Sequence, residues 1–190
     1  MKAFLKTNII LILSIILCVA LVNPGATYAL KAKTVRPSKI AAFNKIVVTG
    51  NVEVLLVWSP KIDIHFSHDN EGVAKVIQKD RVLHIVGNDR LKSKIVVYTN
   101  DIYRIEAHNQ AVIRCEGAIN IKYLQIIMKD NAWADLNVNA EGLYTEISDH
   151  SILKLEGNAK SFTLLSNGAS KLVTNNFLSQ KMSNNTQNAD

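Results

Sequence analysis

The sequence DNAWADL, residues 130–136, decides the fold because its pattern recurs three more times in the C-terminal half of the chain. The other copies are NQAVIRC at 109–115, DHSILKL at 149–155 and NGASKLV at 167–173. Each copy begins with Asn or Asp, has a small residue two places later and an apolar residue four places beyond that. The small residues are Ala111, Ala132, Ser151 and Ala169, at intervals of 21, 19 and 18 residues.

Alternating apolar residues precede each Asx turn, as in Leu124, Ile126 and Met128, and indicate a strand with one buried face. A repeat of about twenty residues made of short strands and turns is typical of stacked coils. In such a stack each coil pairs in parallel with the next, ~4.8 Å away. The residues therefore favour an all-β parallel β-helix. An antiparallel β-sandwich is the alternative, because short, evenly spaced strands suit it too.

The first residues of the four copies are expected to form a ladder down one edge of the stack. They are Asn109, Asp130, Asp149 and Asn167. Asn and Asp side chains at turns accept hydrogen bonds from nearby backbone N–H groups. We therefore interpret this series as structural.

The N-terminus has the form of a secretory signal peptide. Lys2 and Lys6 precede an apolar run at 9–22, and Thr27-Tyr28-Ala29 offers a cleavage site after Ala29. The run is short for a membrane span, which needs ~20 residues. An uncleaved membrane anchor is the alternative, and lipidation at Cys18 is disfavoured because that cysteine lies inside the apolar run. Export would place the protein in the periplasm, on the outer-membrane surface or outside the cell.

The rest of the chain divides into three parts. Residues 30–42 form a basic lead-in, 43–178 a single β domain, and 179–190 a polar, disordered tail. The formal net charge is +6, and removal of Lys2 and Lys6 with the signal peptide leaves +4. Cys115 is then the only cysteine, so the domain depends on packing rather than on a disulfide.

The stretch Phe43-x-x-Ile46-x-Val48-x-Gly50-Asn51-Val52-x-Val54 resembles the opening of the head GIN domain family. The resemblance continues through 83–85, the strand at 95–98 and the repeats, and covers roughly 43–177. That family consists of exported, mostly Bacteroidetes proteins named as autotransporter adhesin heads. The resemblance implies a right-handed β-helix-like domain in the cell envelope, with adhesion as its function. It implies no catalytic residues.

Several kinds of chemistry are not indicated by the sequence. No phosphate-binding loop, nucleophile elbow or Cys/His cluster is present, so neither a cofactor nor a metal is expected. The basic residues are scattered in an exported chain, which argues against nucleic acid as a partner. A carbohydrate-active β-helix enzyme is the alternative function. Its hydrolytic pair would be Asp130 and Asp149, at the short separation that retaining glycosidases use.

Exposed aromatic side chains are the best candidates for ligand contact, because such rings stack on sugars and anchor interfaces. Trp133 is expected to face outward, and Tyr144 and Tyr123 are further candidates. We therefore predict a non-enzymatic envelope or surface module that presents a β-helix face to a glycan or an envelope protein. Peripheral membrane contact and self-association through the coil ends are compatible with this function.

Overall fold

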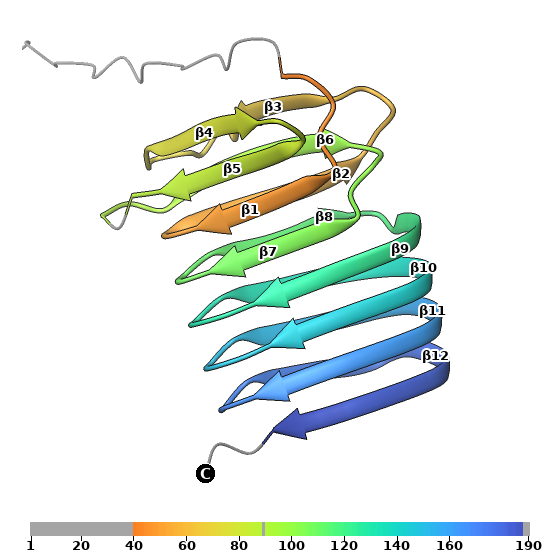
Figure 1. The fold of residues 1–190 in the computed structure, drawn as a ribbon. Coiled ribbons are helices and arrows are strands. Elements are labelled where there is room, and N and C mark those ends of the chain that lie inside the picture. Colours follow the sequence, from red (N-terminus) through yellow and green to blue (C-terminus); the bar gives the residue numbers. More distant parts are fainter. Residues whose placement is uncertain (1–39, 89, 188–190) are drawn as a thin grey trace, which may run out of the picture. The chain divides into compact units, whose positions relative to one another are not determined.

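The computed structural model describes residues 40–88 and 90–187, which contain twelve strands and no helix (Figure 1). All twelve strands belong to one curled sheet. Their bounds are β1 Lys45–Thr49, β2 Val52–Trp58, β3 Asp63–Phe66, β4 Ala74–Lys79, β5 Val82–Gly87, β6 Ser93–Thr99, β7 Arg104–His108, β8 Val112–Glu116, β9 Ile119–Met128, β10 Trp133–Ile147, β11 Ile152–Asn167 and β12 Lys171–Gln187. The prediction of an all-β domain is confirmed. The predicted signal peptide at 1–29 lies outside the described residues.

The strands of the repeats pair in parallel, as the spacing predicts. Trp133 of β10 is aligned with Ile152 of β11, and Ile152 with Lys171 of β12, so the offset is 19 residues each time. The first part of β10 also pairs with β8, and its second part with β9. Among the described residues, only β3–β6 and β4–β5 are antiparallel pairs. The alternative of an antiparallel sandwich is therefore wrong.

The long strands β10 and β11 each turn a corner at the same level. Buried and outward residues alternate along β10 until Ala140, after which Glu141 and Gly142 both face outward and Leu143 is buried again. In β11, Lys160 and Ser161 interrupt the alternation in the same way. Two outward residues in succession let the chain change direction without removing an apolar residue from the core.

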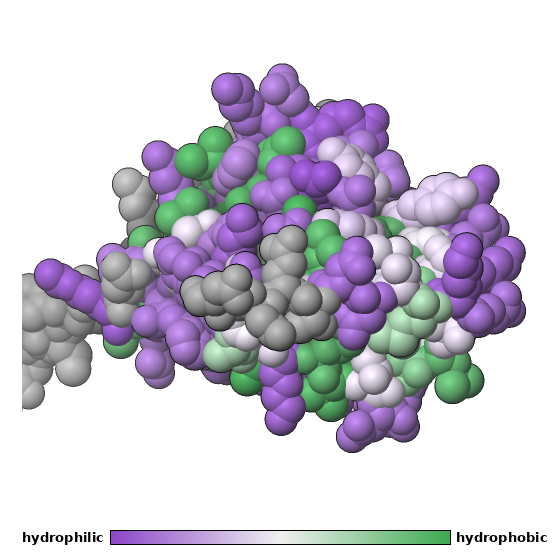
Figure 2. Space-filling model, turned by 60° about the horizontal axis from the view of Figure 1, so that its bottom comes forward, coloured by the Kyte–Doolittle hydropathy of each residue, from purple (hydrophilic) through white to green (hydrophobic). Residues whose placement is uncertain are grey.

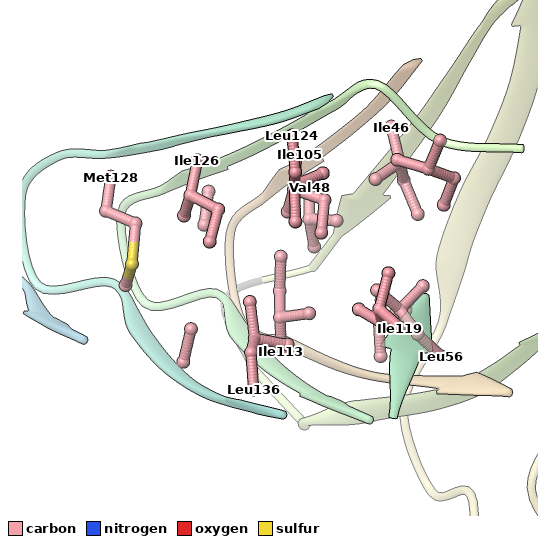
Figure 3. Close-up of a cluster of buried hydrophobic side chains, with 14 of the residues drawn as sticks. Ile46, Val48, Leu56, Ile105, Ile113, Ile119, Leu124, Ile126, Met128 and Leu136 are labelled. Carbon is pink, nitrogen blue, oxygen red and sulfur yellow. The ribbon is translucent and has the colours of Figure 1, made fainter. Parts of the chain in front are cut away.

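The core lies between the parts of the sheet before and after these corners. Figure 3 shows Leu56, Ile113, Ile119 and Leu136 in one row, facing Ile46, Ile105, Leu124 and Ile126 in another. All eight side chains are at most 3% exposed. Period-two apolar residues therefore provide both rows, and the domain is stabilised by their packing, with Cys115 as a free thiol.

One end of the sheet is formed by β3 and β4, which run antiparallel to β6 and β5. Between Asp69 and Asp80 the alternation of apolar residues in the sequence lapses, which would suit a short helical turn capped by Asn70, but residues 74–79 form β4. Asn70 instead accepts a hydrogen bond from the Lys94 backbone N–H at its Oδ1, 2.7 Å away. The domain also begins before Phe43, since the Ala41 N–H donates to Gln78 Oε1 of β4 at 2.9 Å.

The other end of the sheet is β12, which continues to Gln187. The predicted domain end at 178 and disordered tail at 179–190 are therefore wrong for residues 179–187. The polar composition of this segment suggests disorder, but its backbone pairs with β11 as far as Asn167↔Gln187. Backbone hydrogen bonds between strands do not require apolar side chains. Leu178 and Met182 of β12 are 75% and 56% exposed. Figure 2 brings this end of the sheet forward and shows apolar areas among hydrophilic ones.

Candidate functional site

Trp133 of β10 lies among outward side chains of three neighbouring strands, β8, β10 and β11. Trp133 is half-buried and lies between Val112 of β8 and Ile152 of β11 in register. Two residues further along the strands, Arg114, Asp135 and Lys154 are aligned in the same way. We call the cluster formed by Arg114, Trp133, Asp135, Asn137, Lys154 and Glu156 the Trp133 ledge.

Arg114 covers part of the tryptophan ring. Its guanidinium carbon lies 4.5 Å from the Trp133 ring centroid, which is the geometry of a cation–π interaction. The same guanidinium donates from Nε to Glu53 Oε1 at 3.0 Å. Two contacts therefore hold Arg114 in place, and its guanidinium group covers one face of the indole.

Lys154 joins the two carboxylates of the ledge. Its Nζ lies 3.2 Å from Asp135 Oδ2 and 3.1 Å from Glu156 Oε1. Hydrogen bonds to Glu156 and Asp135 raise the pKa of Lys154, so its ammonium group stays charged. The ledge thus alternates cations and anions and carries little net charge.

The surface beside Trp133 is hollowed. A shallow depression of about 320 Å³ is lined by Arg114, Asp135, Asn137, Lys154 and Glu156, with Cys115 and Gly117. Asn137 donates its backbone N–H to Cys115 Sγ at 3.0 Å, and burial raises the pKa of this thiol. A protonated, half-buried thiol is a poor nucleophile, so the depression is suited to binding rather than to thiol chemistry.

Tyr123 lies at a corner and Tyr144 lies after it, whereas Trp133 lies before it. Tyr123 of β9 is aligned with Gly142 of β10, where a side chain would collide with the tyrosine ring at 2.8 Å. Tyr144 donates its hydroxyl to Glu146 Oε2 at 3.3 Å, and burial together with the Glu146 charge raises the pKa of Tyr144. The three predicted ligand-contact residues therefore do not form one site.

The predicted Asx series occupies successive turns, with one shift. Asn109, Asp130 and Asp149 all have φ between 59° and 60°, in the left-handed region that Asn and Asp tolerate. In the fourth turn Gly168 has this conformation, with φ 67°, so Asn167 is one residue out of register. Correspondingly, Ser170 rather than exposed Ala169 takes the place of Ser151.

Each aspartate of this series binds the turn before it. Asp130 Oδ2 accepts the Asn109 backbone N–H at 2.9 Å, and Asp149 Oδ2 accepts that of Asp130 at 3.0 Å. The hydrogen bonds from Asp130 and from the Ser148 hydroxyl lower the pKa of Asp149. A general acid needs a raised pKa, so this environment argues against Asp149 as the acid of a hydrolytic pair.

A second ladder was not predicted. Asn139 donates from Nδ2 to Asn120 Oδ1 at 2.9 Å, and Asn158 donates to Asn139 Oδ1 at 2.7 Å. These residues are 19 apart, which is the signal that could have revealed them. The same offsets of 19 and 21 relate Asp135 to Lys154 and Arg114, so the partners of the Trp133 ledge could also have been found from register.

Residues 40–88 and 90–187 contain no group of three or more His, Cys, Asp or Glu arranged to hold a metal ion. In the same part of the chain, no helix has the length and hydropathy needed to cross a membrane.

Comparison with known proteins gives a family and a fold. The family described as "Putative auto-transporter adhesin, head GIN domain" matches residues 42–187. Among curated proteins, no sequence matches the chain. A solved structure described as a putative adhesin from Bacteroides fragilis is 22% identical, with a TM-score of 0.66 over 80% of this chain and 75% of that one.

Two further solved structures come from Parabacteroides distasonis. One, described as a putative adhesin, is 13% identical with a TM-score of 0.60, covering 80% of this chain and 76% of its own. The other, described as a putative lipid binding protein, is 10% identical with a TM-score of 0.55, covering 78% and 76%. At these identities the likeness shows a shared fold.

Proposed function

The chain belongs to the head GIN domain family of auto-transporter adhesins, and from that premise we propose that it is an exported, non-catalytic envelope or surface module that binds a glycan at the Trp133 ledge. The family supports a surface-directed, adhesin-like role. The ledge suggests the ligand, because sugars are bound by an aromatic ring beside planar polar side chains. We place the protein in the periplasm, on the outer-membrane surface or outside the cell.

The architecture we infer is a right-handed parallel β-helix. Parallel pairing at an offset of 19 residues along the whole of β10 and β11, with corners at the same level in the two strands, supports a chain that winds in successive coils. The strong preference of parallel connections for one hand supports right-handed winding. Such coils would hold the ledge residues on adjacent rigid strands, which favours a preorganised binding surface.

The observation that carries the binding proposal is the position of Trp133 two residues before the aligned row of Arg114, Asp135 and Lys154. Arg114 and Lys154 offer donors, while Asp135, Asn137 and Glu156 offer acceptors around one depression. Since cations and anions alternate, a neutral oligosaccharide fits the ledge better than a strongly charged one. The ion pairs at the ledge are open to solvent and worth little individually, so sugar hydroxyls can replace part of them.

A screen of neutral oligosaccharides, with a purified envelope polysaccharide fraction as a second probe, tests this proposal. We expect Trp133→Ala to weaken binding about tenfold or more, since aromatic residues dominate binding energy at such sites. Tyr123→Ala is the matched control, because it removes an exposed aromatic ring at the corner, outside the Trp133 ledge. Circular dichroism and thermal unfolding show that both variants remain folded.

Two outcomes contradict the proposal. If Tyr123→Ala weakens binding while Trp133→Ala does not, the glycan binds elsewhere on the domain. If the parent protein degrades an envelope polysaccharide, and the double variant Asp130→Asn with Asp149→Asn does not, the protein is an enzyme.

A further inference from the structure

The outward side chains of β4, β5 and β1 form a surface of apolar and basic residues, which we call the β4–β5–β1 face. The three strands are neighbours in the sheet, with β4 at its edge (Figure 1). The inward residues Ile46 and Val48 of β1, and Leu83 and Ile85 of β5, are fully buried. In register, Lys75 lies opposite Val86 and Lys79 opposite Val82, so cations and apolar groups alternate across the strands as well as along them.

This face exposes unusually many apolar side chains. Ile77 and Val86 are 39% and 43% exposed, and Val73, just before β4, is 72% exposed. Along the edge strand the outward order is Val73, Lys75, Ile77, Lys79. Neighbouring exposed aliphatic residues are typical of a surface that meets an apolar partner.

The charge of the face has one sign. The outward positions of β4, β5 and β1 include no aspartate or glutamate. Lys45 of β1 pairs with Glu106 of the next strand, β7, at 2.8 Å. Lys75 and Lys79 have no salt bridge within the described part of the chain, so both are available to an anionic partner.

We propose that the β4–β5–β1 face docks on the surface of an anionic lipid bilayer. Phosphate groups would neutralise Lys75 and Lys79, while Val73, Ile77 and Val86 would enter the boundary between headgroups and acyl chains. A soluble polyanion could satisfy the lysines but offers nothing apolar to the aliphatic side chains. The Trp133 ledge lies on other strands, so this inference does not depend on the glycan proposal.

Sedimentation with lipid vesicles tests the inference. The chain from Leu30 is used, because it contains every described residue of the hydrophobic core. The probes are vesicles of phosphatidylcholine alone and vesicles with about one-third phosphatidylglycerol. We expect binding to the anionic vesicles only, and weaker binding at high salt.

Two pairs of substitutions separate the contributions of charge and apolar contact. Lys75→Gln with Lys79→Gln should weaken binding roughly twenty-five-fold, at about fivefold for each lysine. Val73→Ser with Ile77→Ser should also weaken it, by about tenfold. The matched controls are on β12, at the other end of the sheet: Lys171→Gln with Lys181→Gln, and Leu178→Ser with Met182→Ser. They should leave binding nearly unchanged.

Three results would overturn the inference. The first is no binding of the parent chain to anionic vesicles. The second is an equal loss in the β12 controls, which would indicate general charge attraction. The third has two parts: Val73→Ser with Ile77→Ser binds anionic vesicles as well as the parent does, and heparin displaces the parent from these vesicles completely. This result would identify a soluble polyanion as the partner. Unfolding curves for each variant distinguish loss of binding from loss of fold.

Discussion

The carboxylate of Asp149 accepts the backbone N–H of Asp130 at 3.0 Å, although the two residues are 19 apart in the chain. Asp130 does the same for Asn109, and the backbone of Asp130 accepts the His150 N–H at 2.8 Å. Successive turns are thus joined by side-chain and main-chain hydrogen bonds. The carboxylate series ends at Gly168, which has no side chain to offer.

Acid should weaken the folded state between about pH 4 and pH 2. The Lys94 ammonium and the Ser67 hydroxyl lower the pKa of Asp69 to about 2, and backbone donation from Asp130 lowers that of Asp149. A carboxyl group whose pKa is lowered by folding stabilises the protein above its unfolded pKa, near 3.8, and this contribution disappears as the pH falls through the folded value.

The measurement for this prediction is the urea midpoint from pH 6 to pH 2. Asp69→Asn and Asp149→Asn should each be less stable at pH 6 and lose less stability on acidification than the parent. Glu71→Gln, which removes an exposed carboxylate, serves as the control. Parallel curves for the parent and both aspartate variants would contradict this assignment.

Gly157→Ala should destabilise the domain by about 3 kcal/mol, because two effects combine. Gly157 has φ 98°, and a Cβ there would lie 2.4 Å from the carbonyl oxygen of Val138 on the neighbouring strand. Gly117→Ala is the matched control, since Gly117 has φ 75° but no atom within 4 Å of the added methyl group. It should cost only about 1 kcal/mol. Equal losses in chemical denaturation would show that β10 and β11 are not this close.

Asn139→Ala should destabilise more than Asn158→Ala. The central amide of the ladder donates to Asn120 and accepts from Asn158, whereas Asn158 makes one bond in the ladder. With about 0.5–1 kcal/mol for each hydrogen bond, we expect about 1–2 kcal/mol for Asn139→Ala and about half of that for Asn158→Ala. Thermal unfolding measures the difference, and the reverse order would exclude a cooperative ladder.

Ending the chain at Ser179 should destabilise the domain, although the removed segment is polar. Residues 181–187 pair with β11, and Met182 is aligned with Phe162, which is only 2% exposed. Uncovering Phe162 and Leu164 should cost about 2 kcal/mol or more. A chain ending at Gln187 retains all of these contacts and is the control. If both truncated chains unfold like the parent, β12 does not extend beyond Ser179 in solution.

Much of the fold is readable from local pattern. Alternation of apolar residues predicts the strands, and the recurrence of Asx, small and apolar residues predicts parallel pairing and the turns at Asn109, Asp130 and Asp149. These features depend on a few neighbouring residues, because side-chain direction alternates along any strand and left-handed turns select Asn, Asp or Gly.

The sites and the ends of the domain depend on pairing between distant residues. Only the register aligns Arg114, Asp135 and Lys154 next to Trp133 and shifts the fourth turn to Gly168. It also places Tyr123 at a corner and Tyr144 beyond it, away from the Trp133 ledge. Only the sheet order places β5 between β1 and β4 and so joins the lysines and valines of the three strands on one surface. The sequence alone therefore determined a parallel all-β domain with stacked Asx turns. The tertiary structure decided which side chains share a surface, because hydrogen bonding between strands sets that alignment and local pattern does not.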